Sequence, residues 1–262
     1  MGIVNVTPDS FSDGGMFEDA EVAVKHGLRL LEEGADVLDV GGESTRPGSD
    51  PVGEEEEERR VLPVLDGLRR EAPEAVLSVD TRKAGVAEAA LAAGADVVND
   101  ISAGADPAMW GVAAAAGAGM VLMHMQGEPG TMQANPRYDD VVADVRAFLS
   151  ARLETAVAAG IGPDRLCVDP GIGFGKNLEH NLDLLRAIDS FRELGVPVLL
   201  GVSRKRFVGE LSGAEDPAGR VEGSVAAAVW CAAQGVDLVR VHDVGPTVRA
   251  LRVVDAIARG WS

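Results

Sequence analysis

Aromatic, cysteine and basic residues are scarce in this chain of 262 residues. Phe, Trp and Tyr make up 4% of the sequence, and there are two cysteines. Cys167 and Cys231 show no metal-ligand spacing and no disulfide framework, so we expect both to be core residues. Lys and Arg number 24 against 42 Asp and Glu, which gives a net charge of −18. This acidity argues against a nucleic-acid partner, because phosphate backbones are bound by basic surfaces.

Long apolar runs are lacking as well. No run of about 18 apolar residues is present, and the first residues are patterned as a strand rather than as a secretory leader. We therefore expect a cytoplasmic protein that does not bind membranes. A hydrophobic content of 46% is enough for a full core, and no Pro/Ser-rich linker interrupts the chain. The sequence predicts a single domain over residues 1–262.

Short apolar segments alternate with Ala/Leu/Glu/Arg-rich stretches about eight times, which predicts a parallel sheet covered by helices. The segments end in polar or charged residues: Asn5, Asp39, Asp80, Asn99 with Asp100, His124, Asp169, Ser203 to Lys205, and Arg240 to His242. Gly34, Gly94 and Gly235, and more loosely Gly117, each follow a helix-like stretch, where a left-handed cap needs no Cβ.

Two architectures fit this alternation. An open doubly wound sheet would place its ligand at one crevice where the strand order reverses. A (β/α)8 TIM barrel of about 250 residues would instead bring all the strand ends to one mouth. Because polar residues follow nearly every strand, we predict the barrel, with the active site at the C-terminal ends of its strands.

Three of these strand-end residues suit a flat heterocycle. Asp80, Asn99 and Asp169 supply acceptors and an amide, which match a ring that bears an amino group, N–H groups and a carbonyl. Each alone could serve as a helix N-cap. The cations Arg46 and Arg240, together with His242, are suited to a phosphate or diphosphate.

Other features are expected to be structural. Glu54 to Glu58, followed by Arg59 and Arg60, predict a solvated helix face with acids in its first turns. The glycine-rich segment 171–176 lacks the pattern of a nucleotide P-loop, because Pro170 replaces its first glycine and Asn177 its Ser/Thr. We expect His26 and His180 to be structural or exposed.

Five segments together resemble the dihydropteroate synthases. They are GIVNVTPDSFSDGG at 2–15, GESTRPG at 42–48, DPGIGFGK at 169–176, SRK at 203–205 and RVHDV at 240–244. The resemblance spans essentially the whole chain. It implies a sulfonamide-target enzyme of folate biosynthesis, commonly a homodimer. Such an enzyme condenses (7,8-dihydropterin-6-yl)methyl diphosphate with 4-aminobenzoate to give 7,8-dihydropteroate and diphosphate.

The resemblance also implies roles for individual residues. Asp80, Asn99, Asp169 and Lys205 resemble the pterin pocket, with Arg240 packed over the ring. Asn5, Arg46, Arg240 and His242 resemble the diphosphate site, with Asn5 as a Mg2+ ligand. Thr45, Pro47, Phe174 and Lys205 resemble the aminobenzoate site, and Phe11 and Asp13 lie on a loop expected to close over it. Asp80, Asp169, Lys205 and Arg240 are the expected catalytic residues.

These roles predict a dissociative displacement. An aromatic amine is a weak nucleophile, so stabilisation of the departing diphosphate and of positive charge on the pterin should dominate catalysis. We expect neither a covalent intermediate nor a general base.

Two features depart from the family pattern. Arg206 stands where many members have a serine that receives the benzoate carboxylate, so we expect altered affinity for substrate or drug. The chain also lacks the N-terminal strands that often plug the far end of the barrel in this family, so we expect a truncated start or another closure. A pterin-dependent methyltransferase and a catalytically silent paralogue with a binding or regulatory role remain alternatives.

Overall fold

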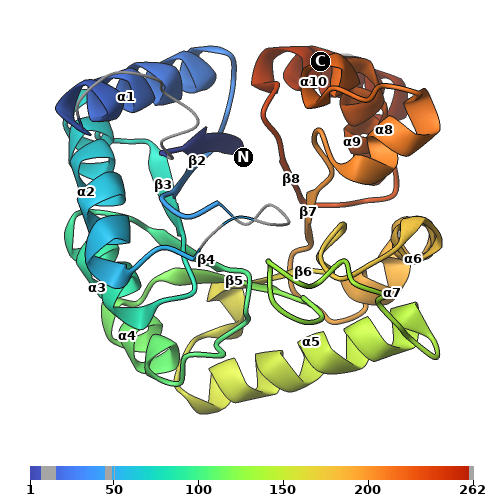
Figure 1. The fold of residues 1–262 in the computed structure, drawn as a ribbon, viewed down its shortest axis with the longest axis horizontal. Helices are drawn as coiled ribbons and strands as arrows, with labels where there is room; N and C mark the ends of the chain where they lie inside the picture. The colour runs from blue at the N-terminus through green and yellow to red at the C-terminus, as the bar shows by residue number, and fades with distance from the viewer. Residues whose placement is uncertain (7–15, 45–48, 50, 260–262) are drawn as a thin grey trace.

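The computed structural model describes residues 1–6, 16–44, 49 and 51–259. Eight parallel strands occur in this part of the chain: β1 (Gly2–Asn5), β2 (Val37–Gly41), β3 (Val76–Asp80), β4 (Val97–Asp100), β5 (Gly119–Met123), β6 (Leu166–Asp169), β7 (Leu199–Gly201) and β8 (Leu238–Arg240). They form a ring with helices outside it (Figure 1).

The ring is built from two hydrogen-bonded groups of strands. Strands β1 to β6 pair in sequence order, and β7 pairs with β8. Single parallel bridges join the groups, Val168 to Val198 on one side and Gly2 to Val241 on the other. The two bridges close the barrel, so the predicted barrel is confirmed and the open doubly wound sheet is excluded.

The covering helices are α1 (Met16–Glu32), α2 (Glu54–Glu71), α3 (Ala84–Ala92), α4 (Ala108–Ala116), α5 (Val141–Ala158), α6 (Leu178–Arg186), α7 (Ile188–Arg192), α8 (Arg206–Ser212), α9 (Val221–Ala233) and α10 (Val244–Arg259). The predicted junction glycines Gly34, Gly94, Gly117 and Gly235 all have positive φ. They let the chain leave a helix and enter the next strand without steric conflict.

Side chains alternate along each strand between the helices and the barrel interior. Leu38 and Val40 of β2 are fully buried in the hydrophobic core, and a Cβ added at Gly27 of α1 would touch Leu38. Asp39, between them, is also fully buried and hydrogen bonds to Ser78, its register partner on β3. Apolar residues thus attach the strands to the helices, while polar groups occupy the interior near the mouth.

The described helices include none that is long and apolar enough to cross a membrane. Cys231 is fully buried, as predicted, and Cys167 is partly buried in β6. His26 Nδ1 accepts a hydrogen bond from Arg29 Nη2 at 2.9 Å, and His180 completes a capping box with Asn177 at the start of α6. The structural roles predicted for these two histidines are therefore confirmed.

Candidate active site

The polar residues at the ends of the strands converge at one mouth of the barrel. Asp80 and Asn99 are register partners on β3 and β4. Arg240, at the end of β8, reaches across the ring and donates from Nη2 to Asp80 Oδ2 at 2.7 Å. Residues far apart in the sequence therefore meet here, as the barrel predicts.

Asp39 lies at the centre of this cluster. Arg240 Nε donates to its Oδ2 at 2.5 Å, Asn99 Nδ2 donates to the same oxygen at 3.0 Å, and Ser78 Oγ donates to Oδ1 at 2.6 Å. A buried carboxylate with three donors is well compensated. Sequence reasoning placed Asp39 at a strand end but gave it no site role. The available signal was a carboxylate inside an apolar strand.

Burial controls the protonation of the site carboxylates. It raises the pKa of Asp80 to about 7, with smaller contributions from the charges of Asp39, Glu57 and Asp100, while Arg240 opposes the shift. Burial also raises the pKa of Asp169, against the influence of Lys205 and of the Gly171 N–H, which donates to Asp169 at 2.7 Å. A cationic ligand beside these groups favours their ionised forms.

Lys205 follows β7 and contacts the loop after β6. Its ammonium donates to the carbonyl of Ile172 and lies 4.4 Å from the centre of the Phe174 ring. Burial lowers its pKa to about 8, although the nearby Asp169 raises it. Arg204, directly before it, has a φ of 57°, a left-handed conformation that is uncommon for a residue with a side chain. The site thus combines a desolvated cation with an aromatic face.

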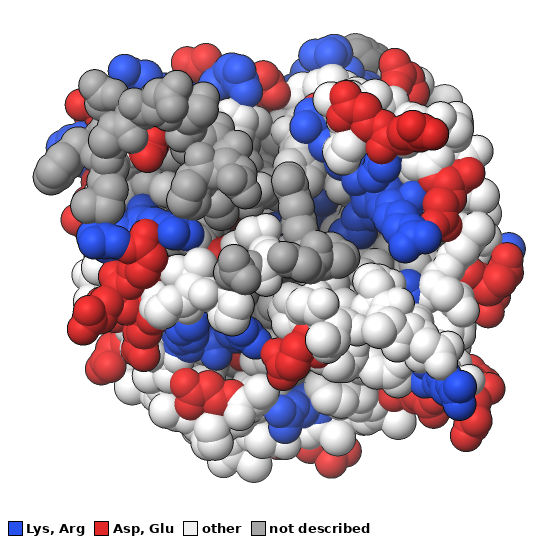
Figure 2. All heavy atoms as spheres, in the orientation of Figure 1, with Lys and Arg blue, Asp and Glu red and all other residues white. Residues whose placement is uncertain are grey.

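The loops after β7 and β8 are tied together beside this cation. Arg204 forms a bidentate pair with Asp243, with distances of 2.6 and 2.9 Å. The backbone N–H of His242 donates to Ser203 Oγ at 3.1 Å, and its Nδ1 lies 3.0 Å from the same hydroxyl. These contacts set the relative positions of Lys205 and His242. Figure 2 shows Lys and Arg side chains gathered beside α8, with acidic side chains next to them.

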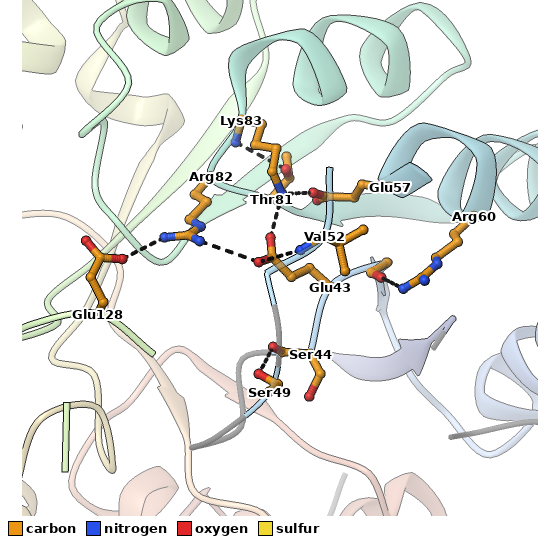
Figure 3. A network of polar contacts seen from close by, with 11 residues as sticks. Glu43, Ser44, Ser49, Val52, Glu57, Arg60, Thr81, Arg82, Lys83 and Glu128 are labelled. Atoms are coloured by element: carbon orange, nitrogen blue, oxygen red, sulfur yellow. Dashed lines mark hydrogen bonds and ion pairs between the residues drawn. The ribbon is translucent and has the colours of Figure 1, made fainter. Parts of the chain in front are cut away.

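A second polar network lies where β2 and β3 end (Figure 3). Glu43 pairs with Lys83 at 2.5 Å and with Arg82 at 3.4 Å, and Lys83 also pairs with Glu57 of α2. Glu43 Oε1 accepts the backbone N–H of Val52 at 3.4 Å. The side chain of Glu57 is 1% exposed. The prediction of a wholly solvated acidic face at residues 54–58 was therefore wrong at this position, because α2 turns Glu57 toward Lys83.

Several predicted site residues lie outside the described part of the chain: Phe11, Asp13, Thr45, Arg46 and Pro47. Asn5 ends β1, is partly buried and pairs in register with Gly41. Arg206 begins α8, and its side chain is 82% exposed and pairs with Glu210 at 2.6 Å. Among the described residues, no group of three or more His, Cys, Asp or Glu is arranged to hold a metal ion.

Comparison with known proteins agrees with this geometry. Residues 1–242 match the family model of the pterin binding enzymes. A dihydropteroate synthase of Neisseria meningitidis serogroup C is 50% identical over 261 residues, which is 98% of this chain and 92% of the relative.

Solved structures agree as well. A Xanthomonas albilineans dihydropteroate synthase with 4-aminobenzoic acid has a TM-score of 0.93 and 53% identity, and a complex of that enzyme with 7,8-dihydropteroate has a TM-score of 0.90 and 51% identity. Both comparisons cover 98% of this chain and 92% of the other. The chain belongs to the pterin-binding enzyme family and, within it, to the dihydropteroate synthases.

Proposed function

We propose that the chain joins (7,8-dihydropterin-6-yl)methyl diphosphate to 4-aminobenzoate, giving 7,8-dihydropteroate and diphosphate in folate biosynthesis. One observation carries the proposal beyond family membership: Arg240 is held between Asp39 and Asp80 at the barrel mouth. One guanidinium can then lie over a ring held by carboxylates and also meet the departing anion.

The pterin site is assigned to Asp80, Asn99, Asp169 and Lys205, with Arg240 over the ring. The ring's amino and N–H groups need acceptors, which the two carboxylates and the amide supply. Because the pKa of Asp80 is about 7, this carboxylate is mostly ionised above that pH and can stabilise positive charge that spreads into the pterin.

The diphosphate site is assigned to Asn5, Arg46, Arg240 and His242. The amide oxygen of Asn5 is the kind of ligand that Mg2+ prefers, and Mg2+ commonly takes few protein oxygens alongside waters and phosphate. Bound there, Mg2+ would neutralise part of the charge on the leaving group. Arg240 and His242 orient the diphosphate and stabilise the charge that develops on it.

The aminobenzoate site is assigned to Thr45, Pro47, Phe174 and Lys205, with Phe11 and Asp13 closing over it. Lys205 offers a cation to the carboxylate, and Phe174 offers a ring face. We also assign to this site the sulfonamides that mimic aminobenzoate. Displacement is dissociative, so the carbon–oxygen bond between the pterin methylene and the diphosphate should still break when an unreactive aminobenzoate analogue is bound. Cleavage that strictly follows the reactivity of the nucleophile would contradict this mechanism.

Assembly as a cytoplasmic homodimer is part of the proposal. The paired helices α9 and α10 carry exposed apolar side chains, with Trp230 50%, Val253 59% and Ile257 81% exposed. Burying such a patch against a second copy would remove apolar surface from water. Sedimentation of the wild type and of the Ile257→Asp variant tests this, and a monomeric wild type would contradict it.

The deciding experiment measures diphosphate release from the pterin diphosphate with Mg2+, with and without 4-aminobenzoate. Release coupled to dihydropteroate formation is expected. An Asp80→Asn variant should lose about 100-fold or more in kcat/KM, because charge stabilisation in a water-excluded site is lost. Pterin binding without turnover would instead indicate a silent paralogue or a methyltransferase.

A further inference from the structure

The backbone after β6 is packed tightly against the segment after β5. Gly171, Gly173 and Gly175 have φ values of 72°, 83° and 61°, which favour glycine. A Cβ added at Gly171 would overlap the carbonyl oxygen of His124, and one at Gly175 would overlap that of Gln126. The segment therefore has little room to shift toward the segment after β5.

Side chains hold this segment by its carbonyl groups. Each of the four consecutive carbonyls of residues 172–175 accepts a hydrogen bond from a different side chain: Ile172 from Lys205, Gly173 from Gln133 at 2.6 Å, Phe174 from Lys176 at 2.9 Å, and Gly175 from Tyr138 at 2.9 Å. We call residues 171–176 the carbonyl-held loop. Its conformation depends on side chains as well as on its own sequence.

Lys176 is the most buried of these four donors, with 2% of the residue exposed. Its ammonium reaches the carbonyl of Phe174 at 2.9 Å, Nδ1 of His124 at 3.0 Å and the carbonyl of His124 at 3.3 Å. An ammonium has three donors, and three acceptors surround this one. Such a buried charge persists only where its partners compensate for the lost hydration.

His124 is suited to accept from Lys176. Burial, with the nearby ammonium of Lys176, lowers the pKa of His124 to about 3, so its imidazole is neutral and can present Nδ1 as an acceptor. Its ring packs edge-on against Phe148 of α5 at 4.9 Å. Burial lowers the pKa of Lys176 itself to about 7, with Asp169 raising it and Lys205 lowering it further.

The contacts of Lys176 lead directly to the site. The Phe174 carbonyl that it holds belongs to the residue whose ring lies beside the ammonium of Lys205. Lys205 also donates to Ile172, within the same loop. A shift of the carbonyl-held loop would therefore move the ring and the cation together.

We propose that Lys176 is a positioning residue: by tying the Phe174 carbonyl to His124, it fixes the surface on which Lys205 and Phe174 receive aminobenzoate. The identity of that ligand rests on the proposed function. The pterin shares Lys205 and Asp169 with this loop, but it should depend less on Lys176, because Asp80, Asn99 and Arg240 also hold it from other strands.

The test compares Lys176→Met and the milder Lys176→Gln with the wild type, with rates normalised to folded enzyme. The KM for 4-aminobenzoate should rise about tenfold in Lys176→Met, and that for the pterin diphosphate by less than about threefold, because misplacing a binding group by about 1 Å has effects of this size or larger. Leu184→Ala, in the buried face of α6, is the control for general destabilisation and should leave both KM values near those of the wild type.

A second measurement needs no turnover. Amide hydrogen exchange in the free protein should quicken about tenfold or more across residues 171–176 of both Lys176 variants, while β1 and β2 stay protected. A wild type without activity would refute the proposed function, whereas the exchange pattern would still decide the role of Lys176. Unchanged loop exchange, or an unchanged KM for aminobenzoate in folded and active variants, would overturn the inference.

Discussion

Replacing Asp39 with Asn tests how the centre of the site is held. Asp39 is fully buried and accepts hydrogen bonds from Ser78, Asn99 and Arg240. Asparagine has nearly the same volume, but its amide has one oxygen and carries no charge. With its oxygen toward Arg240 and Asn99, the amide can donate from its NH2 group to the Ser78 hydroxyl, but Arg240 loses one of its two carboxylates.

The expected loss of stability follows from this geometry. Removing one partner of a buried ion pair costs about 3–5 kcal/mol. Arg240 still pairs with Asp80, so its charge stays compensated, and we expect the lower end, about 3 kcal/mol. For a chain of this size that corresponds to roughly 6–12 °C in Tm. Urea unfolding and thermal scans of the ligand-free protein measure both quantities.

The same substitution should change the pH dependence. The charge of Asp39 helps to raise the pKa of Asp80 to about 7, so its removal should lower that pKa. The pH profile of kcat/KM reports the pKa values of groups in the free enzyme. Its acid limb should then move to lower pH. Because the folded pKa of Asp80 lies above its unfolded value of about 3.9, its protonated form stabilises the fold fully below about pH 4. This stabilisation is lost as the pH rises toward 7. In the variant, the total loss of unfolding free energy over this pH range should be smaller.

Asp96→Asn provides the matched control. Asp96 precedes β4 at the opposite end of the barrel, where it accepts from Leu77 N at 2.9 Å and from Arg69 at 2.8 Å. Its side chain is 48% exposed, so we expect a loss of about 1 kcal/mol and no change in the acid limb. An Asp39→Asn enzyme as stable as the wild type, or one with an unmoved acid limb, would refute the reasoning.

Three further predictions concern the rim of the site. Arg206→Ser should change the KM for aminobenzoate by less than about twofold, because the Arg206 side chain is exposed and pairs with Glu210; a larger change in steady-state kinetics would contradict this. Glu43→Gln should lower the free energy of unfolding, measured in urea, by about 1–3 kcal/mol, since Lys83 loses a partner whose side chain is 10% exposed. A loss below about 0.5 kcal/mol would contradict this prediction. Asn5→Ala should raise the Mg2+ concentration needed for half-maximal activity about tenfold or more, and an unchanged Mg2+ titration would remove Asn5 from the metal site.

The barrel could be predicted because its determinants are local. Each junction glycine follows a helix and precedes a strand, so a short window of sequence reports one repeat of the fold. Gly34 and Gly94 both have the positive φ that the pattern predicts. Asp80, Asn99 and Arg240 could be proposed as site residues because a polar residue at the end of an apolar strand is also a local signal.

The partners of these residues could not be predicted in the same way. The contact of Arg240 with Asp39 spans 201 residues, and nothing near either residue specifies it. Burial of Glu57 depends on Lys83 of a different repeat. The pairing of Arg206 with Glu210, one helical turn away, is by contrast a local contact. Sequence patterns indicate which end of a strand bears the polar site residues. Contacts between residues far apart in the sequence decide which of these side chains pair.

The two groups of strands have a consequence for the order in which the protein folds. Strands β1 to β6 pair with neighbours in sequence, so this sheet can grow by successive additions. Strands β7 and β8 join it through the bridges at Val198 and Val241, and the latter requires contact between the two ends of the barrel sequence. Such distant contacts form slowly, because loop closure must precede them. Lys205 and Arg240 follow and end these two strands, so a refolding chain should gain most of its helix signal before it can bind a pterin.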